Sequence, residues 1–112
     1  MWHPKIDTAI PIRRYQYGEF QAVLLGEIEA SRGQNYLYIL AVLREGADQP
    51  EVYITCEPQP TGLFCVSVLS ADSEQSISEA ADWGKEEAFV DFALNGVQQM
   101  FGLSDETPVR LL

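Results

Sequence analysis

The chain has 112 residues, of which 46% are apolar and 21% are charged, which is the size and composition of one globular domain. This composition excludes a largely disordered chain, and no apolar run approaches the roughly 20 residues that a membrane span needs. The first five residues lead into no apolar signal-peptide core, so we expect a cytoplasmic protein.

The net charge of −10 is unevenly distributed. Residues 1–56 carry five Lys and Arg against seven Asp and Glu, whereas residues 57–112 carry two against ten. This balance argues against binding to a nucleic-acid backbone or to an anionic membrane surface, since both need clustered Lys and Arg. Two interpretations stay open, namely solubility alone and a basic partner, which includes mimicry of a nucleic-acid phosphate track.

The first two thirds of the chain predict strands. Residues 1–9 are expected to form a loose arm, because Pro4 and Pro11 discourage regular structure. Alternating and β-branched segments bounded by turn residues then predict five strands at 11–17, 20–29, 36–44, 52–57 and 63–70. Gly18 at the first central position between the first two strands favours a two-residue type II′ hairpin.

The last third of the chain predicts helices. Asp72 is expected to cap a short helix over 73–82, which Trp83-Gly84 would end. Apolar residues at spacings of three and four predict a long amphipathic helix over 85–101, with Gly102 as its stop. Residues 103–112 are expected to form a tail or a short closing segment.

These elements predict a single α+β domain over residues 1–112. Its sheet would be an antiparallel five-stranded meander, followed by a short and a long C-terminal helix packed on one sheet face. We expect Phe89 and Phe92 of the long helix to lie in the core against the sheet, because both fall on its apolar stripe.

Strand 36–44 is the most informative element, because it is apolar on both of its faces. Pairing it with strand 20–29 so that one face is consistently apolar predicts a helix-covered face with no charged residue, listed as Phe20, Ala22, Leu24, Gly26, Ile28, Leu37, Ile39, Ala41 and Leu43. One long helix and one short helix cover little more than one face, so the opposite face would be left for another partner.

The opposite face is predicted to be an interface, with an aliphatic centre, tyrosines and a rim arginine. The residues expected there are Val23, Leu25, Tyr36, Tyr38, Leu40, Val42, Arg44 and Tyr53. Three candidates could bury this face: the chain's own N-terminal arm or short helix, a second copy of the chain, or a ligand or foreign protein. A two-fold homodimer is the simplest, since the same surface then serves both subunits.

Chemically reactive groups are sparse. The one histidine, His3, falls in the predicted arm, and a general base needs a rigid support. Cys56 and Cys65 flank a predicted hairpin turn and are expected to be close together. A cross-strand disulfide or redox pair is the alternative, but we expect free thiols, because a reducing cytoplasm disfavours disulfides. Carboxylates gather over 72–91, where we expect solvated helix faces rather than a converging acid–base or metal site.

The sequence therefore predicts no catalytic residues, no cofactor-binding residues and no metal ligands, and it favours a protein that is not an enzyme. The preferred function is a non-catalytic protein-interaction or accessory module that is homodimeric or binds another protein. The alternatives are a domain that binds a small apolar molecule and an acidic inhibitor that mimics nucleic acid. Binding to nucleic acid or to a membrane is not expected.

Overall fold

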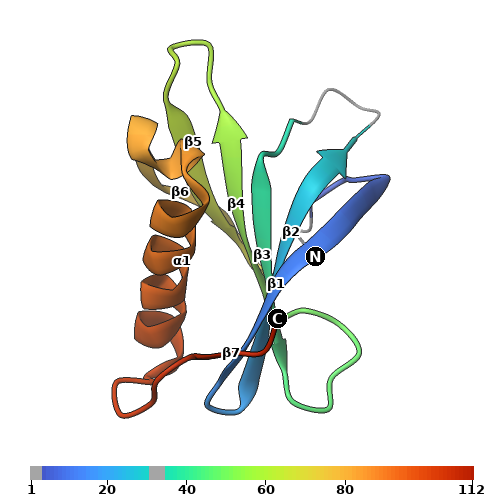
Figure 1. The fold of residues 1–112 in the computed structure, drawn as a ribbon, viewed down its shortest axis with the longest axis vertical. Coiled ribbons are helices and arrows are strands. Elements are labelled where there is room, and N and C mark those ends of the chain that lie inside the picture. The colour runs from blue at the N-terminus through green and yellow to red at the C-terminus, as the bar shows by residue number, and fades with distance from the viewer. Residues whose placement is uncertain (1–3, 31–34) are drawn as a thin grey trace.

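The computed structural model describes residues 4–30 and 35–112, so His3, residues 1–3 of the expected arm and residues 31–34 of the predicted turn lie outside the described residues. A twisted antiparallel sheet forms one layer, and a C-terminal helix packs on one of its faces (Figure 1). The elements are β1 (Thr8–Tyr17), β2 (Phe20–Glu29), β3 (Tyr38–Arg44), β4 (Val52–Pro58), β5 (Phe64–Leu69), β6 (Glu74–Ala80), the 3-10 helix η1 (Ala81–Gly84), α1 (Glu86–Phe101) and β7 (Val109–Arg110).

The predicted α+β class, the antiparallel sheet and the long C-terminal helix are confirmed. The described residues form a sheet of seven strands in the order β6-β5-β4-β3-β2-β1-β7, so the predicted number of five is wrong. The hairpin between β1 and β2 has a two-residue turn, with Tyr17 opposite Phe20. Gly18 adopts a φ of 58° there, which an L-residue rarely adopts and which the predicted turn needs.

The predicted short helix over 73–82 is wrong, because this segment forms β6 and then the single turn η1. A tight turn brings the chain back along β5, with the N–H of Ser70 donating to the carbonyl of Ser73 at 2.9 Å. Strand β6 then pairs with β5 from Glu74 to Ala80, which gives the backbone groups on its β5 side partners without a helix. Serine is a weak helix former that competes for backbone hydrogen bonds, so a neighbouring strand can override the weak capping pattern.

The two chain ends differ in how well the sequence predicts them. Strand β1 begins at Thr8 rather than at residue 11, and the N–H of Asp7 donates to the carbonyl of Glu29 at 2.8 Å. Residues 103–112 contain a short closing strand, one of the two predicted outcomes: β7 pairs with β1, and the N–H of Leu111 donates to the carbonyl of Arg14 at 2.7 Å. Edge pairing of this kind needs only backbone groups, so the side-chain pattern carries little signal for it.

The helix covers the face that carries Leu24 and Leu40, not Leu24 and Ile39 as predicted. Cross-strand partners share a face, and Leu24 lies opposite Leu40 while Ala22 lies opposite Val42. A shift of one residue in register moves every side chain of a strand to the other face, which explains the error. Because β3 is apolar on both faces, its own pattern could not select the register.

The main core lies between α1 and this face of the sheet. Phe89 is fully buried and stacks on Tyr38 with ring centroids 5.6 Å apart, so its predicted place in the core is confirmed. Phe92 is only half-buried and stacks on Trp83 at 4.4 Å, beside β6 rather than over the predicted sheet residues. Phe92 lies three residues after Phe89, so its side chain points from a different side of α1.

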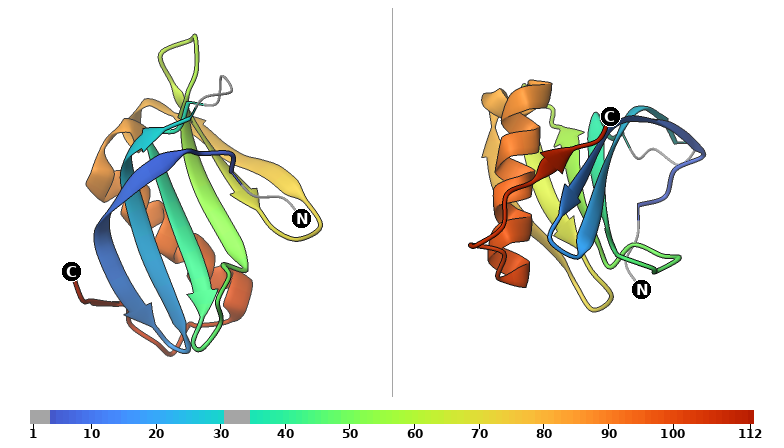
Figure 2. Two further views of the ribbon diagram at one scale, coloured as in Figure 1. Left: turned by 90° about the vertical axis from the view of Figure 1, so that its right-hand side faces the viewer. Right: turned by 60° about the horizontal axis from the view of Figure 1, so that its bottom comes forward.

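The face opposite α1 is buried at its centre as well. Ile39 and Thr55 are fully buried there, and Ala41, Ser67 and Leu69 are less than a tenth exposed. Residues 4–7 run along this side of the sheet, away from α1 (Figure 2), and Pro4 is buried. The sheet therefore has two covered regions in one chain, and the exposed apolar side chains of the described residues lie elsewhere.

Candidate functional site

The structure divides the predicted interface between the two faces of the sheet. Val23, Leu25 and Tyr53 lie on the face opposite α1, because they share it with Ala41 and Leu69 through their register partners. Tyr38, Leu40 and Val42 pack instead in the core with α1. The eight residues therefore form no single surface, and Leu40, which was expected in the aliphatic centre of the interface, is 0% exposed.

The remaining two predicted interface residues are held within the chain. Arg44 lies over the ring of Phe20 at 4.7 Å, donates to Glu51 at 2.8 Å and also pairs with Glu19. Tyr36 precedes β3 and is buried, and burial together with the charges of Glu57 and Glu74 raises its pKa to about 12. Burial also raises the pKa of the Tyr38 and Tyr53 phenols. All three phenols are therefore neutral at physiological pH and supply no base.

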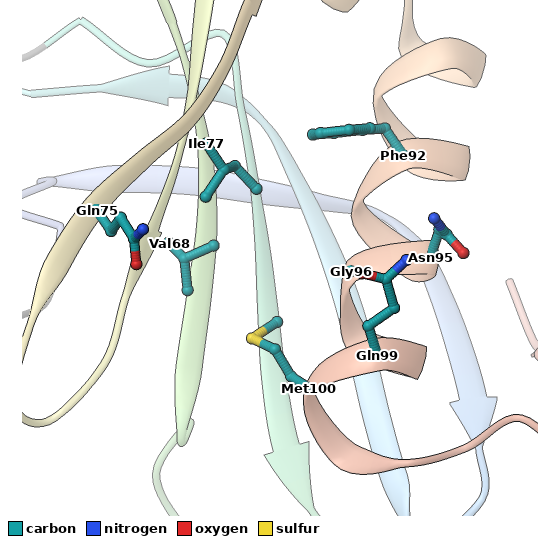
Figure 3. Close-up of a pocket in the computed structure, with 8 residues that line it drawn as sticks. All are labelled: Val68, Gln75, Ile77, Phe92, Asn95, Gly96, Gln99 and Met100. Carbon is teal, nitrogen blue, oxygen red and sulfur yellow. The ribbon is translucent and has the colours of Figure 1, made fainter.

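A groove of about 390 Å³ lies between α1 and the β5–β6 hairpin. Figure 3 shows Ile77 and Val68 pointing from the strands toward the helix, and Phe92 and Met100 pointing back toward the strands. Among the described residues, the lining combines apolar side chains with three side-chain amides and contains no charged group: Val68, Gln75, Ile77, Phe92, Asn95, Gly96, Gln99 and Met100. Its size falls in the range of about 300–1,000 Å³ that is typical of ligand-binding clefts.

Local structure explains why the groove is open. Ile77 is the extra residue where the register of β6 against β5 shifts, because Ser78 lies opposite Val66 and Ser76 lies opposite Ser67. A bulge of this kind bends an edge strand and re-aims its side chain. The helix leans on the central strands, with Gly96 close to Ile54, so β6 is left uncovered and every residue from Glu74 to Ile77 is exposed.

Ile77 and Met100 are 42% and 41% exposed, which is high for large apolar side chains. They face the same groove from a strand and from a helix, so their exposed surfaces combine into one apolar site. The other exposed large apolar side chains of the described residues lie in β1 or at the chain's C-terminal end, listed as Ile10, Val109, Leu111 and Leu112. The groove is therefore a hollowed place at which two such side chains gather.

Strand β6 is also an edge of the sheet. In the described residues it pairs with β5 on one side and with no strand on the other. On its face away from the groove, Glu74 and Glu79 lie opposite Leu69 and Cys65. Both carboxylates are exposed, and within residues 4–30 and 35–112 neither forms an ion pair with Lys or Arg. An open backbone edge thus separates an uncharged groove from an anionic face.

The sequence predicted that the carboxylates of residues 72–91 face solvent from helices, but not all of them do. Glu86 and Glu87 begin α1 and accept hydrogen bonds of 2.6 and 2.5 Å from Arg13, which is 7% exposed. Arg13 also donates to the hydroxyl of Tyr15 at 3.0 Å. Hydrogen bonding by Arg13 lowers the pKa of Glu87. This cluster fixes the N-terminal end of the helix to β1, on the face opposite to the one that carries Glu74 and Glu79.

The two cysteines are free, as predicted, and lie at neighbouring positions of the β4–β5 hairpin. Cys56 is opposite Val66 and Cys65 is opposite Glu57, so the two thiols point to opposite faces. The Cys56 thiol donates to the carbonyl of Trp83 at 3.2 Å, and burial raises its pKa to about 12. A buried thiol with this pKa is a poor nucleophile.

Neither a metal centre nor a membrane span is recognisable in the described part of the chain. No group of three or more His, Cys, Asp and Glu side chains there is arranged to hold a metal ion. No helix in residues 4–30 and 35–112 has the length and apolarity to cross a bilayer. No protein-family model, curated protein or solved structure matches this chain.

Sequence reasoning missed the groove because it assigned residues 73–82 to a helix. A helix would have placed Gln75 and Ile77 on different sides, whereas the bulged strand turns both toward α1. One signal could have identified the strand: Ile77 stands alone between Ser76 and Ser78, a pattern that is typical of an exposed strand and gives a helix no apolar stripe.

Proposed function

We propose that this protein is a non-catalytic protein-interaction module that binds a segment of another protein at the groove between β6 and α1. The observation that carries this proposal is the pairing of exposed Ile77 and Met100 across an uncharged hollow beside an open strand edge. Exposed apolar side chains that gather at a concave site mark interaction surfaces. The absence of a charged group in the lining favours recognition by burial and amide hydrogen bonds over chemistry.

We propose a monomer rather than the homodimer that the sequence favours. The sequence predicts a dimer through the face opposite α1. The centre of that face is already buried within one chain, because Ile39 is 0% exposed and Leu69 is 4% exposed. A buried centre leaves little apolar surface for a standard interface of roughly 800 Å² per subunit. Light scattering across a range of concentrations tests this, and a dimer at every concentration would contradict it.

The same groove supports a second function, the binding of a small neutral molecule. The side-chain amides of Gln75, Asn95 and Gln99 offer donors and acceptors around an apolar floor, which is the composition of small-molecule sites. A fragment screen followed by thermal unfolding would favour this function if a fragment stabilises the protein and Ile77→Ser removes the effect. The open strand edge beside the groove favours the protein segment.

We also propose a cytoplasmic location. Cys56 and Cys65 point to opposite faces of one hairpin and so cannot join in a disulfide without rearrangement of the backbone. Free thiols of this kind are typical of reducing compartments.

A display selection tests the proposed function directly. Random peptides are selected on the immobilised wild-type protein, and binders are then measured on Ile77→Ser and on Val109→Ser. Both positions are exposed β-branched residues on opposite edges of the sheet, so the second variant is a matched control. We expect binders whose affinity falls with Ile77→Ser alone. Selected binders that ignore Ile77→Ser would overturn the proposal.

A further inference from the structure

We propose that the segment bound at the β6–α1 groove is an extended strand of alternating basic and apolar residues, which adds to the sheet along the outer edge of β6. This inference rests on the proposed function and names the chemistry of its partner. Four features of the molecule support it: the edge, the groove, the glutamates and the cost of pairing with a second copy.

The outer edge of β6 offers backbone groups for pairing on both sides of the bulge at Ile77. Its seven residues extend for about 23 Å at roughly 3.3 Å per residue, which suits a partner segment of similar length. The opposite edge of the sheet is formed by β7, which has only two residues. Open edges recruit extended peptides through main-chain hydrogen bonds, while pockets beside the edge choose alternate side chains.

The groove selects apolar side chains on one side of the added strand. Gln75 and Ile77 face the groove, so partner residues beside them would point the same way and contact Met100 of α1. No charged group of residues 4–30 and 35–112 lines the groove. A buried charge there would lose its hydration without gaining a counter-ion, so this side of the partner is apolar.

The two glutamates select basic side chains on the other side of the added strand. Glu74 and Glu79 are exposed on the face of β6 away from the groove. Directly opposed charges of opposite sign stabilise a strand pair, whereas like charges destabilise it. The excess of carboxylates in residues 57–112, ten against two Lys and Arg, adds attraction at longer range.

A second copy of this chain fits the edge poorly. Two-fold antiparallel pairing of β6 with itself would continue the sheet and bring two copies of Glu74 and two of Glu79 onto one face. Four carboxylates on adjacent strands repel one another. The charge pattern therefore favours a foreign basic strand over a dimer through β6.

Calorimetric titration with synthetic peptides tests the inference. The probes are a blocked peptide of about nine residues in which Lys and Val alternate, long enough to span β6, and its counterpart with Glu in place of every Lys. The protein variants are Glu74→Gln with Glu79→Gln, a control with Glu45→Gln and Asp48→Asn in the exposed β3–β4 turn, and Ile77→Ser. The two double variants remove the same charge, so they separate a local effect from net charge.

We expect the Lys peptide to bind the wild type and the control alike. The affinity of the Lys peptide should fall about three- to tenfold in the Glu74/Glu79 variant, since exposed ion pairs contribute modestly. The Glu peptide should bind the wild type no more tightly than the Lys peptide binds that variant. Ile77-dependent binding that is equal for the two peptides, or unchanged in the Glu74/Glu79 variant, would overturn this inference and leave the proposed function standing. If neither these peptides nor display-selected segments bind in an Ile77-dependent way, both are overturned.

Discussion

Substitution of three leucines distinguishes the observed faces of β2 and β3 from those that the sequence predicts. Leu24 and Leu40 lie opposite each other and are 0% exposed under α1, whereas Leu25, the next residue, lies half-buried on the other face. Leu24→Ala and Leu40→Ala each remove buried methyl groups and leave a cavity, at a cost of about 2–5 kcal/mol. This is a large share of the roughly 5–15 kcal/mol that stabilises a typical domain.

Leu25→Ala is the matched control, because it removes the same atoms from the neighbouring position. The hydrophobic contribution scales with the apolar area removed from water, so we expect Leu25→Ala, at a partly exposed position, to lose less stability than Leu24→Ala. Urea unfolding followed by circular dichroism gives the three free energies of unfolding. If Leu40 behaved like Leu25, and both differed from Leu24, the sequence-predicted faces would be right and the register described above would be refuted.

Three further predictions follow from the polar groups. Arg13→Ala should cost about 2–3 kcal/mol in urea unfolding, because it removes packing and the partner of Glu86. Arg13→Met restores packing but not the charge, so it should recover part of this loss, and equal losses for the two variants would contradict the contribution of packing. In a native thiol assay Cys65, which is partly exposed, should react first and Cys56 only on unfolding; simultaneous reaction would contradict the burial of Cys56. Burial, and then the charge of Glu74, raises the pKa of Glu57 in the folded state; between the unfolded and folded pKa values the native protein therefore binds more protons than the unfolded chain, and it loses stability as pH rises through that window. Glu57→Gln should therefore raise the melting temperature at pH 7 but not below the unfolded pKa of about 4.3. An unchanged melting temperature at pH 7 would contradict this prediction.

Elements with a strong side-chain pattern are predictable from this sequence. Strand β2 occupies the predicted residues 20–29, and α1 begins within one residue of the predicted start. The apolar stripe of the helix and the glycine turn at Gly18 are local signals that need no tertiary context. The buried position of Phe89 follows from the same stripe.

Elements that depend on backbone pairing escape such patterns. Strands β6 and β7 are exposed along most of their length, so neither carries an apolar face that alternation could reveal. The register of β3 escapes for the opposite reason, because its two apolar faces satisfy either pairing. Since β6 forms one wall of the candidate groove, the groove could not be predicted without that strand.

Hydrogen exchange at the backbone amides of β6 tests the central claim most directly. The amides are followed by NMR in the free protein and in the protein saturated with the alternating Lys and Val peptide, with β7 at the opposite edge as the internal control. Strand addition predicts that alternate β6 amides, whose N–H groups point to the outer edge, become protected from exchange while the amides of β7 stay unchanged. A saturated complex in which no β6 amide gains protection would contradict docking at this edge.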